Sequence, residues 1–171
     1  MRPTYAQEDV QPMIDELTTV GLTSLTTAEA VDEAIKNTPG MALVVVNSVC
    51  GCAAGNCRPG VAMALQNDKI PDTLGTVFAG VDMEAVAHVR ELMDPVPPSS
   101  PCIAMFKDGE MAGVLERRHI EQMTAIDIGT TLRKAFDEHC TRQGPSVPKE
   151  VFDQNEAVKS CGSTIPLYQG D

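Results

Sequence analysis

The sequence contains no tryptophan, and aromatic residues make up only 4% of its 171 residues. Hydrophobic residues nevertheless account for 43%, so the chain can bury a core built mainly from Val, Leu, Ile, Ala and Met. The nine methionines and many alanines suit helices packed on a sheet. The length fits one compact domain with a modest extension.

Basic residues are scarce, since 13 Lys and Arg against 24 Asp and Glu give a net charge of −11. This sign argues against nucleic-acid binding, which needs a basic face, and against attraction to an anionic membrane. The longest apolar stretch, residues 41–46, is far shorter than the roughly 20 residues of a membrane helix. The N-terminal residues lack the apolar centre of a signal peptide. We expect a cytoplasmic protein with no nucleic-acid or membrane partner.

Apolar periodicity predicts alternating helices and strands. Strands separated by helices and closed by a hairpin imply an α/β fold, with a central mixed sheet of about four strands flanked by helices. Pro59 should kink the helix that contains it. Residues 1–140 would form the domain, and the Gly- and Pro-containing residues 141–171 a C-terminal extension. The predicted helices are 6–20, 26–36, 53–66, 83–93 and 119–139, and the predicted strands are 41–49, 74–81, 102–107 and 111–116.

The segment Cys50-Gly51-Cys52 follows the unbroken apolar run 41–49. Sites in open α/β sheets gather beyond the carboxyl ends of strands. Cys52 opens the next predicted helix, where unpaired N–H groups favour a thiolate. Thiols placed in this way can have pKa values of about 3.5–7.5, and the thiolate is the nucleophile in disulfide exchange. In a cytoplasmic protein such cysteines are more often catalytic or metal-binding than structural.

The spacing of this pair bears on its chemistry. Two Cα–Cα steps allow a separation of at most roughly 7 Å, and a disulfide needs about 4.4–6.8 Å, so Cys50 and Cys52 can bond if Gly51 lets the chain bend. The ring would be tight and easily reduced. This favours isomerase, oxidant or mixed-disulfide chemistry over bulk reduction.

Two motifs carry a resemblance to a known family. Residues 46–55, Val-Asn-Ser-Val-Cys-Gly-Cys-Ala-Ala-Gly, resemble the bacilliredoxin family, a thioredoxin-like branch defined by Cys-Gly-Cys. Residues 97–101, Pro-Pro-Ser-Ser-Pro, followed by an apolar strand and Phe-Lys-Asp-Gly-Glu at 106–110, are similar to the cis-proline loop and hairpin of thioredoxin-like proteins. The resemblance covers roughly residues 5–140.

The resemblance implies a thioredoxin-like three-layer fold and a thiol–disulfide oxidoreductase. Cys50 would attack a mixed disulfide on a client protein and take up a low-molecular-weight thiol such as bacillithiol, or would act as a weak disulfide isomerase. Cys52 would be the resolving or recycling thiol. Pro101 would be the cis-proline facing the pair, and the backbone of Ser100 would bind the substrate strand.

The same resemblance implies the partners and excludes a resident cofactor. The partners would be thiolated client proteins and a reductase for the adduct or disulfide. The small thiol would be a co-substrate, and no cofactor or metal is expected to be bound.

The remaining cysteines leave alternatives open. Cys57 and Cys102 could be inert thiols or additional redox residues that resolve the Cys50 adduct in place of Cys52. Cys161 could be returned to the site by the tail.

Two further functions and one charged pair also stay open. Cys50, Cys52, Cys57 and Cys102 could together hold zinc or an iron–sulfur cluster, although Cys-x-Cys-x4-Cys is not a common zinc pattern. A non-catalytic adaptor could use the cis-proline groove for binding alone. The pair Arg117-Arg118 would be solvated or cap a helix end, or could meet an anionic thiol.

Overall fold

The computed structural model describes residues 2–162. Its central sheet has the order β1-β4-β2-β5-β6, in which β4 runs parallel to β1 and β2, while β5 runs antiparallel to β2 and β6. The mixed α/β sheet is confirmed, but it has five strands rather than about four, because a two-residue strand leaves no apolar pattern. The strands are β1 (Thr23–Ser24), β2 (Met41–Asn47), β4 (Thr73–Phe78), β5 (Cys102–Lys107) and β6 (Glu110–Leu115), and β3 (Lys69–Ile70) pairs separately with β7 (Arg142–Gln143).

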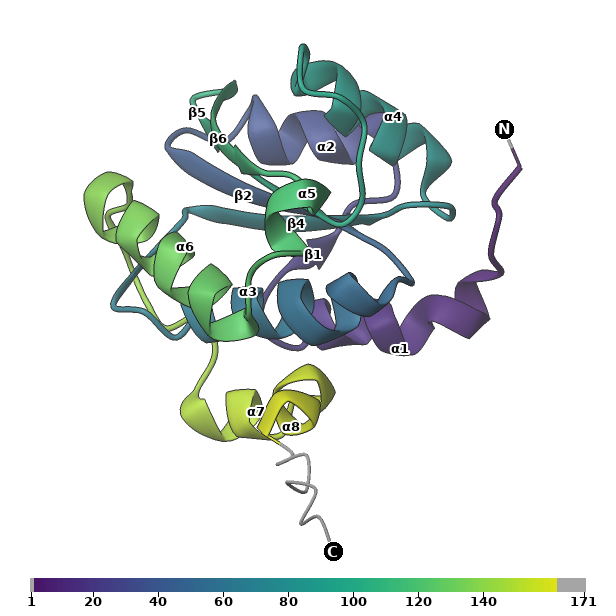
Figure 1. Ribbon diagram of the computed structural model, residues 1–171. Helices are drawn as coiled ribbons and strands as arrows, with labels where there is room; N and C mark the ends of the chain where they lie inside the picture. The colour runs from purple at the N-terminus through teal and green to yellow at the C-terminus, as the bar shows by residue number, and fades with distance from the viewer. Residues whose placement is uncertain (1, 163–171) are drawn as a thin grey trace, which may run out of the picture.

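Helices cover both faces of the sheet (Figure 1). β2 is buried along its whole length, with Leu43 and Val45 in one core cluster and Val44 and Val46 in the other. It is therefore the central strand that an unbroken apolar run predicts, although it ends at Asn47 rather than Val49. One face carries α2 (Ala28–Ile35) and α4 (Met83–Leu92), and the other carries α1 (Gln7–Thr18), α3 (Arg58–Ala64) and α6 (Ala125–His139).

The helix after the cysteine pair is irregular just before Pro59. Residues Ala53–Cys57 form a π-helical segment, η1, in which the N–H of Arg58 bonds to the carbonyl of Ala53, five residues earlier. Pro59 lies in the first turn of α3, and a proline removes an N–H donor from a continuing helix and crowds the turn before it. The wide turn therefore precedes the proline.

The predicted long helix 119–139 is two helices, α5 (Arg117–Ile120) and α6. The Thr124 hydroxyl accepts the N–H of Asp127 at 3.1 Å, and the Asp127 carboxylate accepts the N–H of Thr124 at 2.9 Å. This reciprocal capping box starts α6 afresh. Arg117 therefore opens a short helix of its own instead of capping a helix end.

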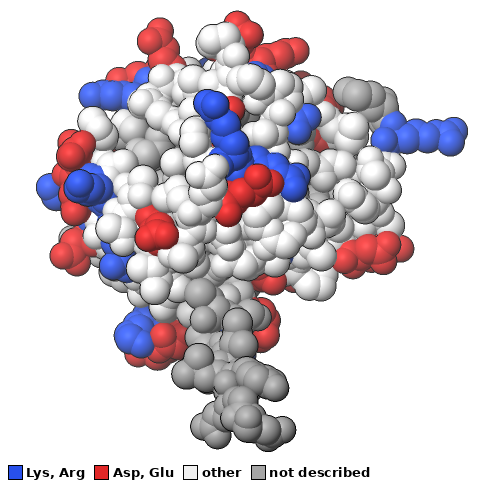
Figure 2. Space-filling view, viewed as in Figure 1, with Lys and Arg blue, Asp and Glu red and all other residues white. Residues whose placement is uncertain are grey.

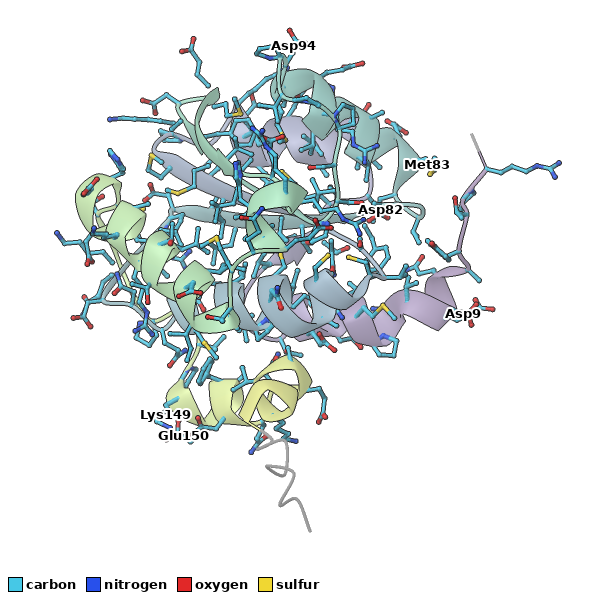
Figure 3. The ribbon with its side chains drawn as sticks, in the orientation of Figure 1. Asp9, Asp82, Met83, Asp94, Lys149 and Glu150 are labelled. Carbon is cyan, nitrogen blue, oxygen red and sulfur yellow. The ribbon has the colours of Figure 1, made fainter. Side chains whose placement is uncertain are left out.

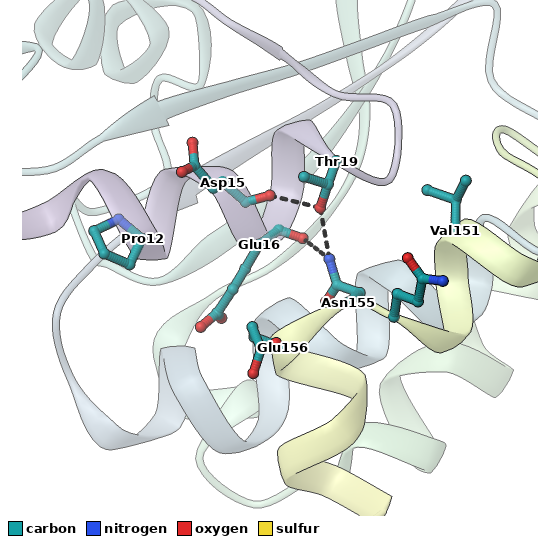
Figure 4. A pocket seen from close by; sticks show the side chains of 8 residues that line it. Pro12, Asp15, Glu16, Thr19, Val151, Asn155 and Glu156 are labelled. Carbon is teal, nitrogen blue, oxygen red and sulfur yellow. Dashed lines mark hydrogen bonds between the residues drawn. The ribbon is translucent and has the colours of Figure 1, made fainter.

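The described part of the C-terminal extension packs on the helical face beneath the sheet. Asn155 Nδ2 donates to the carbonyl of Glu16 and to the hydroxyl of Thr19, both at 2.8 Å (Figure 4). The hydroxyl of Ser146 donates to the carbonyl of Val20 at 2.6 Å. The extension is therefore attached to the end of α1, and it contains α7 (Lys149–Asp153) and α8 (Glu156–Gly162).

Charged side chains project outward over this frame, as Asp9, Asp94, Lys149 and Glu150 show in Figure 3. Each of these four residues is exposed. Among the helices that the structure describes, none combines the length and the apolar character needed to cross a bilayer.

Candidate active site

Cys50 and Cys52 lie just beyond the end of β2, with both thiols free and partly buried. Their Sγ atoms are hydrogen-bonded at 2.7 Å. Gly51 between them is exposed, lies outside the left-handed region, and would place an added Cβ within 4 Å of no other atom. In this dithiol form the backbone at position 51 would therefore accept a side chain, and the role of Gly51 in closing a disulfide stays a prediction.

The two thiols differ in their tendency to ionise. Burial alone would raise the pKa of Cys50, but hydrogen bonds from Cys52, Ser48 and the N–H of Ala53, together with the charge of Arg117, outweigh it and lower that pKa. Burial and the hydrogen bond to Cys50 both raise the pKa of Cys52. Cys50 is therefore the more acidic thiol of the pair, and Cys52 holds its proton more tightly.

A buried arginine holds the loop that carries Cys50. The side chain of Arg58 pairs with the carboxylate of Glu16 and is 3% exposed. Its Nη1 donates to Asn47 Oδ1 at 3.1 Å and to the carbonyl of Ser48 at 2.9 Å. Because α3 is anchored in the core, this fork fixes the chain between β2 and the cysteine pair.

Asn47 completes the anchor at the end of β2. Its amide nitrogen donates to the carbonyl of Met13 in α1 at 3.0 Å, and its Oδ1 accepts the N–H of Ser48 at 2.9 Å. The hydroxyl of Ser48 in turn accepts the N–H of Cys50 at 3.2 Å. A continuous set of hydrogen bonds thus connects α1 to the loop that carries Cys50.

The cis-proline loop reaches the same end of the sheet. The Ser100–Pro101 peptide bond is cis, and β5 starts at the next residue, Cys102, which pairs with Val46 of β2. Arg117 Nη1 donates to the carbonyl of Ser100 at 3.3 Å, and its charge acts on both site cysteines. One arginine therefore connects the cis-proline loop with the cysteine pair.

The other cysteines are buried and held as thiols. Cys57 is 0% and Cys102 is 1% exposed. Burial raises the pKa of Cys57 and raises that of Cys102 to about 12. Cys57 packs in the core cluster with α1, α3 and α6, and Cys102 packs in the cluster with α2 and α4. Cys140 is also buried, and the side chain of Cys161 lies outside the described residues.

The four cysteines considered for a metal centre are not arranged to bind a metal ion together. Within the described part of the chain, no three or more His, Cys, Asp or Glu side chains are placed to hold a metal ion. Cys57 and Cys102 belong to different core clusters.

Sequence reasoning missed the anchor formed by Arg58, Asn47 and Glu16. Two signals were available in the sequence. Arg58 is a single charge beside a run of small and apolar residues, and Asn47 is the polar end of an apolar strand. A buried charge of this kind needs a partner, but the partner is 42 residues away and no spacing rule identifies it.

The chain is similar in sequence to several known proteins. A family model described as disulphide isomerase matches residues 5–140. A bacilliredoxin from Cytophaga hutchinsonii is 54% identical over 134 residues, which cover 78% of this chain and 98% of that protein. A bacilliredoxin from Bacillus cereus is 48% identical over 137 residues, covering 80% and 95% respectively. Mitochondrial thioredoxin 3 from Saccharomyces cerevisiae aligns over 71% of this chain and 98% of its own, with 17% identity and a TM-score of 0.45.

The mixed sheet with a dithiol at the end of its central strand, together with the disulphide isomerase family model and the bacilliredoxin relatives, defines a thiol–disulfide oxidoreductase. Because the family model covers most of the chain and the relatives match over nearly their whole length, the chain belongs to the bacilliredoxin family.

Proposed function

We propose that this protein removes low-molecular-weight thiols from mixed disulfides on client proteins, with Cys50 as the nucleophile. The observation that carries the proposal is the hydrogen-bonded pair, in which the pKa of Cys50 is lowered and that of Cys52 is raised. Thiolate character at an accessible sulfur is what disulfide exchange requires.

The reaction proceeds by two exchanges. The Cys50 thiolate attacks the sulfur of the small thiol, the mixed disulfide breaks, and the client cysteine leaves as a thiolate that takes a proton from water. Cys52 then loses its proton and attacks Cys50 Sγ, which releases the small thiol and leaves a Cys50–Cys52 disulfide. A dithiol reductase supplies the two electrons that restore the pair.

Cys52 is the resolving thiol in this scheme, because its sulfur already lies 2.7 Å from that of Cys50. Cys57 and Cys102 are completely or almost completely buried and stay protonated at neutral pH. Both would need the core to open before they could attack, so we assign them to packing.

Client proteins would bind across the cis-proline loop. Val49, the residue before Cys50, is 37% exposed although it is apolar, and it offers a contact for an apolar client side chain. The carbonyl of Ser100 would bind the client backbone once Arg117 releases it. Bacillithiol is the small thiol that membership of the bacilliredoxin family suggests.

A weak disulfide isomerase activity is a second candidate, favoured by the description of the matching family model. Cys50 would then attack a disulfide within the client, and the released client thiolate would attack elsewhere. Isomerase activity would be detected as the recovery of activity by a test protein whose disulfides have been scrambled.

Mass spectrometry of variants tests the main proposal. After exposure to a thiolated single-cysteine client, Cys52→Ala should accumulate the small thiol on Cys50, and Cys50→Ala should accept none. Cys57→Ala is the matched control and should behave as the unmodified protein does. Transfer of the adduct to Cys50→Ala would overturn the assignment.

A further inference from the structure

A cleft of about 510 Å³ lies between the cis-proline loop and α5. The loop contributes one wall and the region around α5 contributes the other. Its lining residues are Pro97, Pro98 and Ser99 from the loop, and Glu116, Arg117, Arg118 and Glu121 from the opposite wall. Arg117 belongs both to this cleft and to the surroundings of the cysteine pair.

Basic and acidic side chains gather over α5, on a face that is otherwise largely uncharged (Figure 2). Arg117 Nε pairs with Glu121 at 2.6 Å, and these side chains are 46% and 48% exposed. Such exposed ion pairs contribute only about 0–1 kcal/mol. A carboxylate from a bound molecule can therefore replace Glu121, which water would then solvate.

Arg118 has a different place in the cleft. Its Nε and Nη2 both donate to Glu116 Oε1, at 3.2 and 2.8 Å. The Glu116 side chain is only 11% exposed, so this pair persists when a ligand enters. Arg118 thereby offsets the negative charge of Glu116, which would otherwise repel an anion.

We propose that this cleft binds a carboxylate of the low-molecular-weight thiol while its sulfur is transferred to Cys50, with Arg117 as the carboxylate-binding residue. The proposal rests on the thiol-transfer function proposed above and adds the substrate class, namely thiols that carry a carboxylate. The planar guanidinium suits this role because it can donate two parallel hydrogen bonds to one carboxylate. Arg117 already contacts Ser100 beside Pro101, so one side chain can reach both the loop and the incoming thiol.

Two thiols that differ only in charge test the proposal. One single-cysteine client is thiolated with 3-mercaptopropionate or with 3-mercaptopropionamide, and the rate constant for client release by the dithiol protein is measured for each. The ratio of the two rate constants cancels any change in the reactivity of Cys50 and any carboxylate on the client. Arg117→Met should lower the acid-to-amide ratio about three- to tenfold, where tenfold corresponds to about 1.4 kcal/mol. Arg117→Lys should lower it less.

Lys149→Met is the matched control, because it also removes one positive charge from an exposed ion pair with a carboxylate four residues on. Lys149 lies on α7, away from α5 (Figure 3). The acid-to-amide ratio of Lys149→Met should therefore equal that of the unmodified protein. An unchanged ratio in Arg117→Met, or equal slowing of both substrates, would overturn the carboxylate site. Release of neither thiol by the unmodified protein would instead refute the proposed function.

Discussion

Arg58 Nη1 donates a hydrogen bond of 3.1 Å to Asn47 Oδ1, and the two residues are only 2% and 0% exposed. A cation on α3 thus binds the last residue of the central strand, three positions before Cys50. Because Arg58 also pairs with Glu16, its charge is compensated within the core. The position of Cys50 therefore depends on a polar contact beneath the site rather than on the cysteine loop alone.

Substitution of this arginine should destabilise the fold. Arg58→Met leaves the Glu16 carboxylate unpaired and removes donors from Asn47 and Ser48, so the free energy of unfolding should fall by about 2–4 kcal/mol. Denaturant unfolding measures the change. Arg133→Met, which removes an exposed arginine that bonds only to the carbonyl of Met63, should cost less than about 1 kcal/mol. Equal stability of Arg58→Met and the unmodified protein would contradict the role of this contact.

The reactivity of Cys50 should depend on pH through its lowered pKa. At a pH below its pKa a thiol is protonated and unreactive. The rate at which iodoacetamide alkylates Cys50 should therefore rise with pH, and the midpoint of this rise should lie below that of an ordinary cysteine. Cys52→Ala removes the hydrogen-bond donor and should move this midpoint upward. Cys140→Ala, at a buried site in the core, should leave it unchanged. If Cys52→Ala has the same midpoint as the unmodified protein, the two cysteines do not share a proton.

Gly51 should tolerate a side chain in the reduced protein. A Cβ there meets no atom within 4 Å and the backbone is not left-handed, so Gly51→Ala should raise the free energy of unfolding by about 0.4–1 kcal/mol through the unfolded chain. Denaturant unfolding under reducing conditions measures it. At Gly60 the added Cβ would lie 2.7 Å from Ile128, so Gly60→Ala should lose about 1–3 kcal/mol. A comparable loss at Gly51 would refute this account.

A histidine pair should make stability depend on pH. His88 Nε2 lies 2.7 Å from Asp32 Oδ1 and joins α4 to α2. The hydrogen bond to Asp32 raises the pKa of His88, so the stabilisation is complete below the ordinary histidine pKa and is lost as pH rises through the raised value. His88→Gln should therefore cost up to about 1 kcal/mol near pH 5.5 and almost nothing near pH 9. Unfolding at both pH values measures this, and an equal cost at both would contradict it.

Local patterns in the chain account for the frame of this protein. An unbroken apolar run predicts a strand buried on both faces, and β2 is such a strand. Asp108-Gly109 predicts the hairpin, and both residues have positive φ angles, 49° and 90°. The cysteine motif at the end of the run and the Pro-rich loop identify the family. These features are readable because periodicity, turn chemistry and short motifs act between residues close in sequence.

The support of the site, and the set of residues that share it, depend on contacts between residues far apart in the chain. Arg58 and Glu16 are 42 residues apart, and Arg117 is 17 residues from Ser100. It is packing that buries Cys57 and Cys102 in separate clusters and leaves Cys50 and Cys52 partly exposed. The burial, charge and hydrogen bonding at Cys50 come from groups that the folded sheet and its helices bring together. These groups are far apart in the sequence, so no local pattern in the chain predicts their contacts.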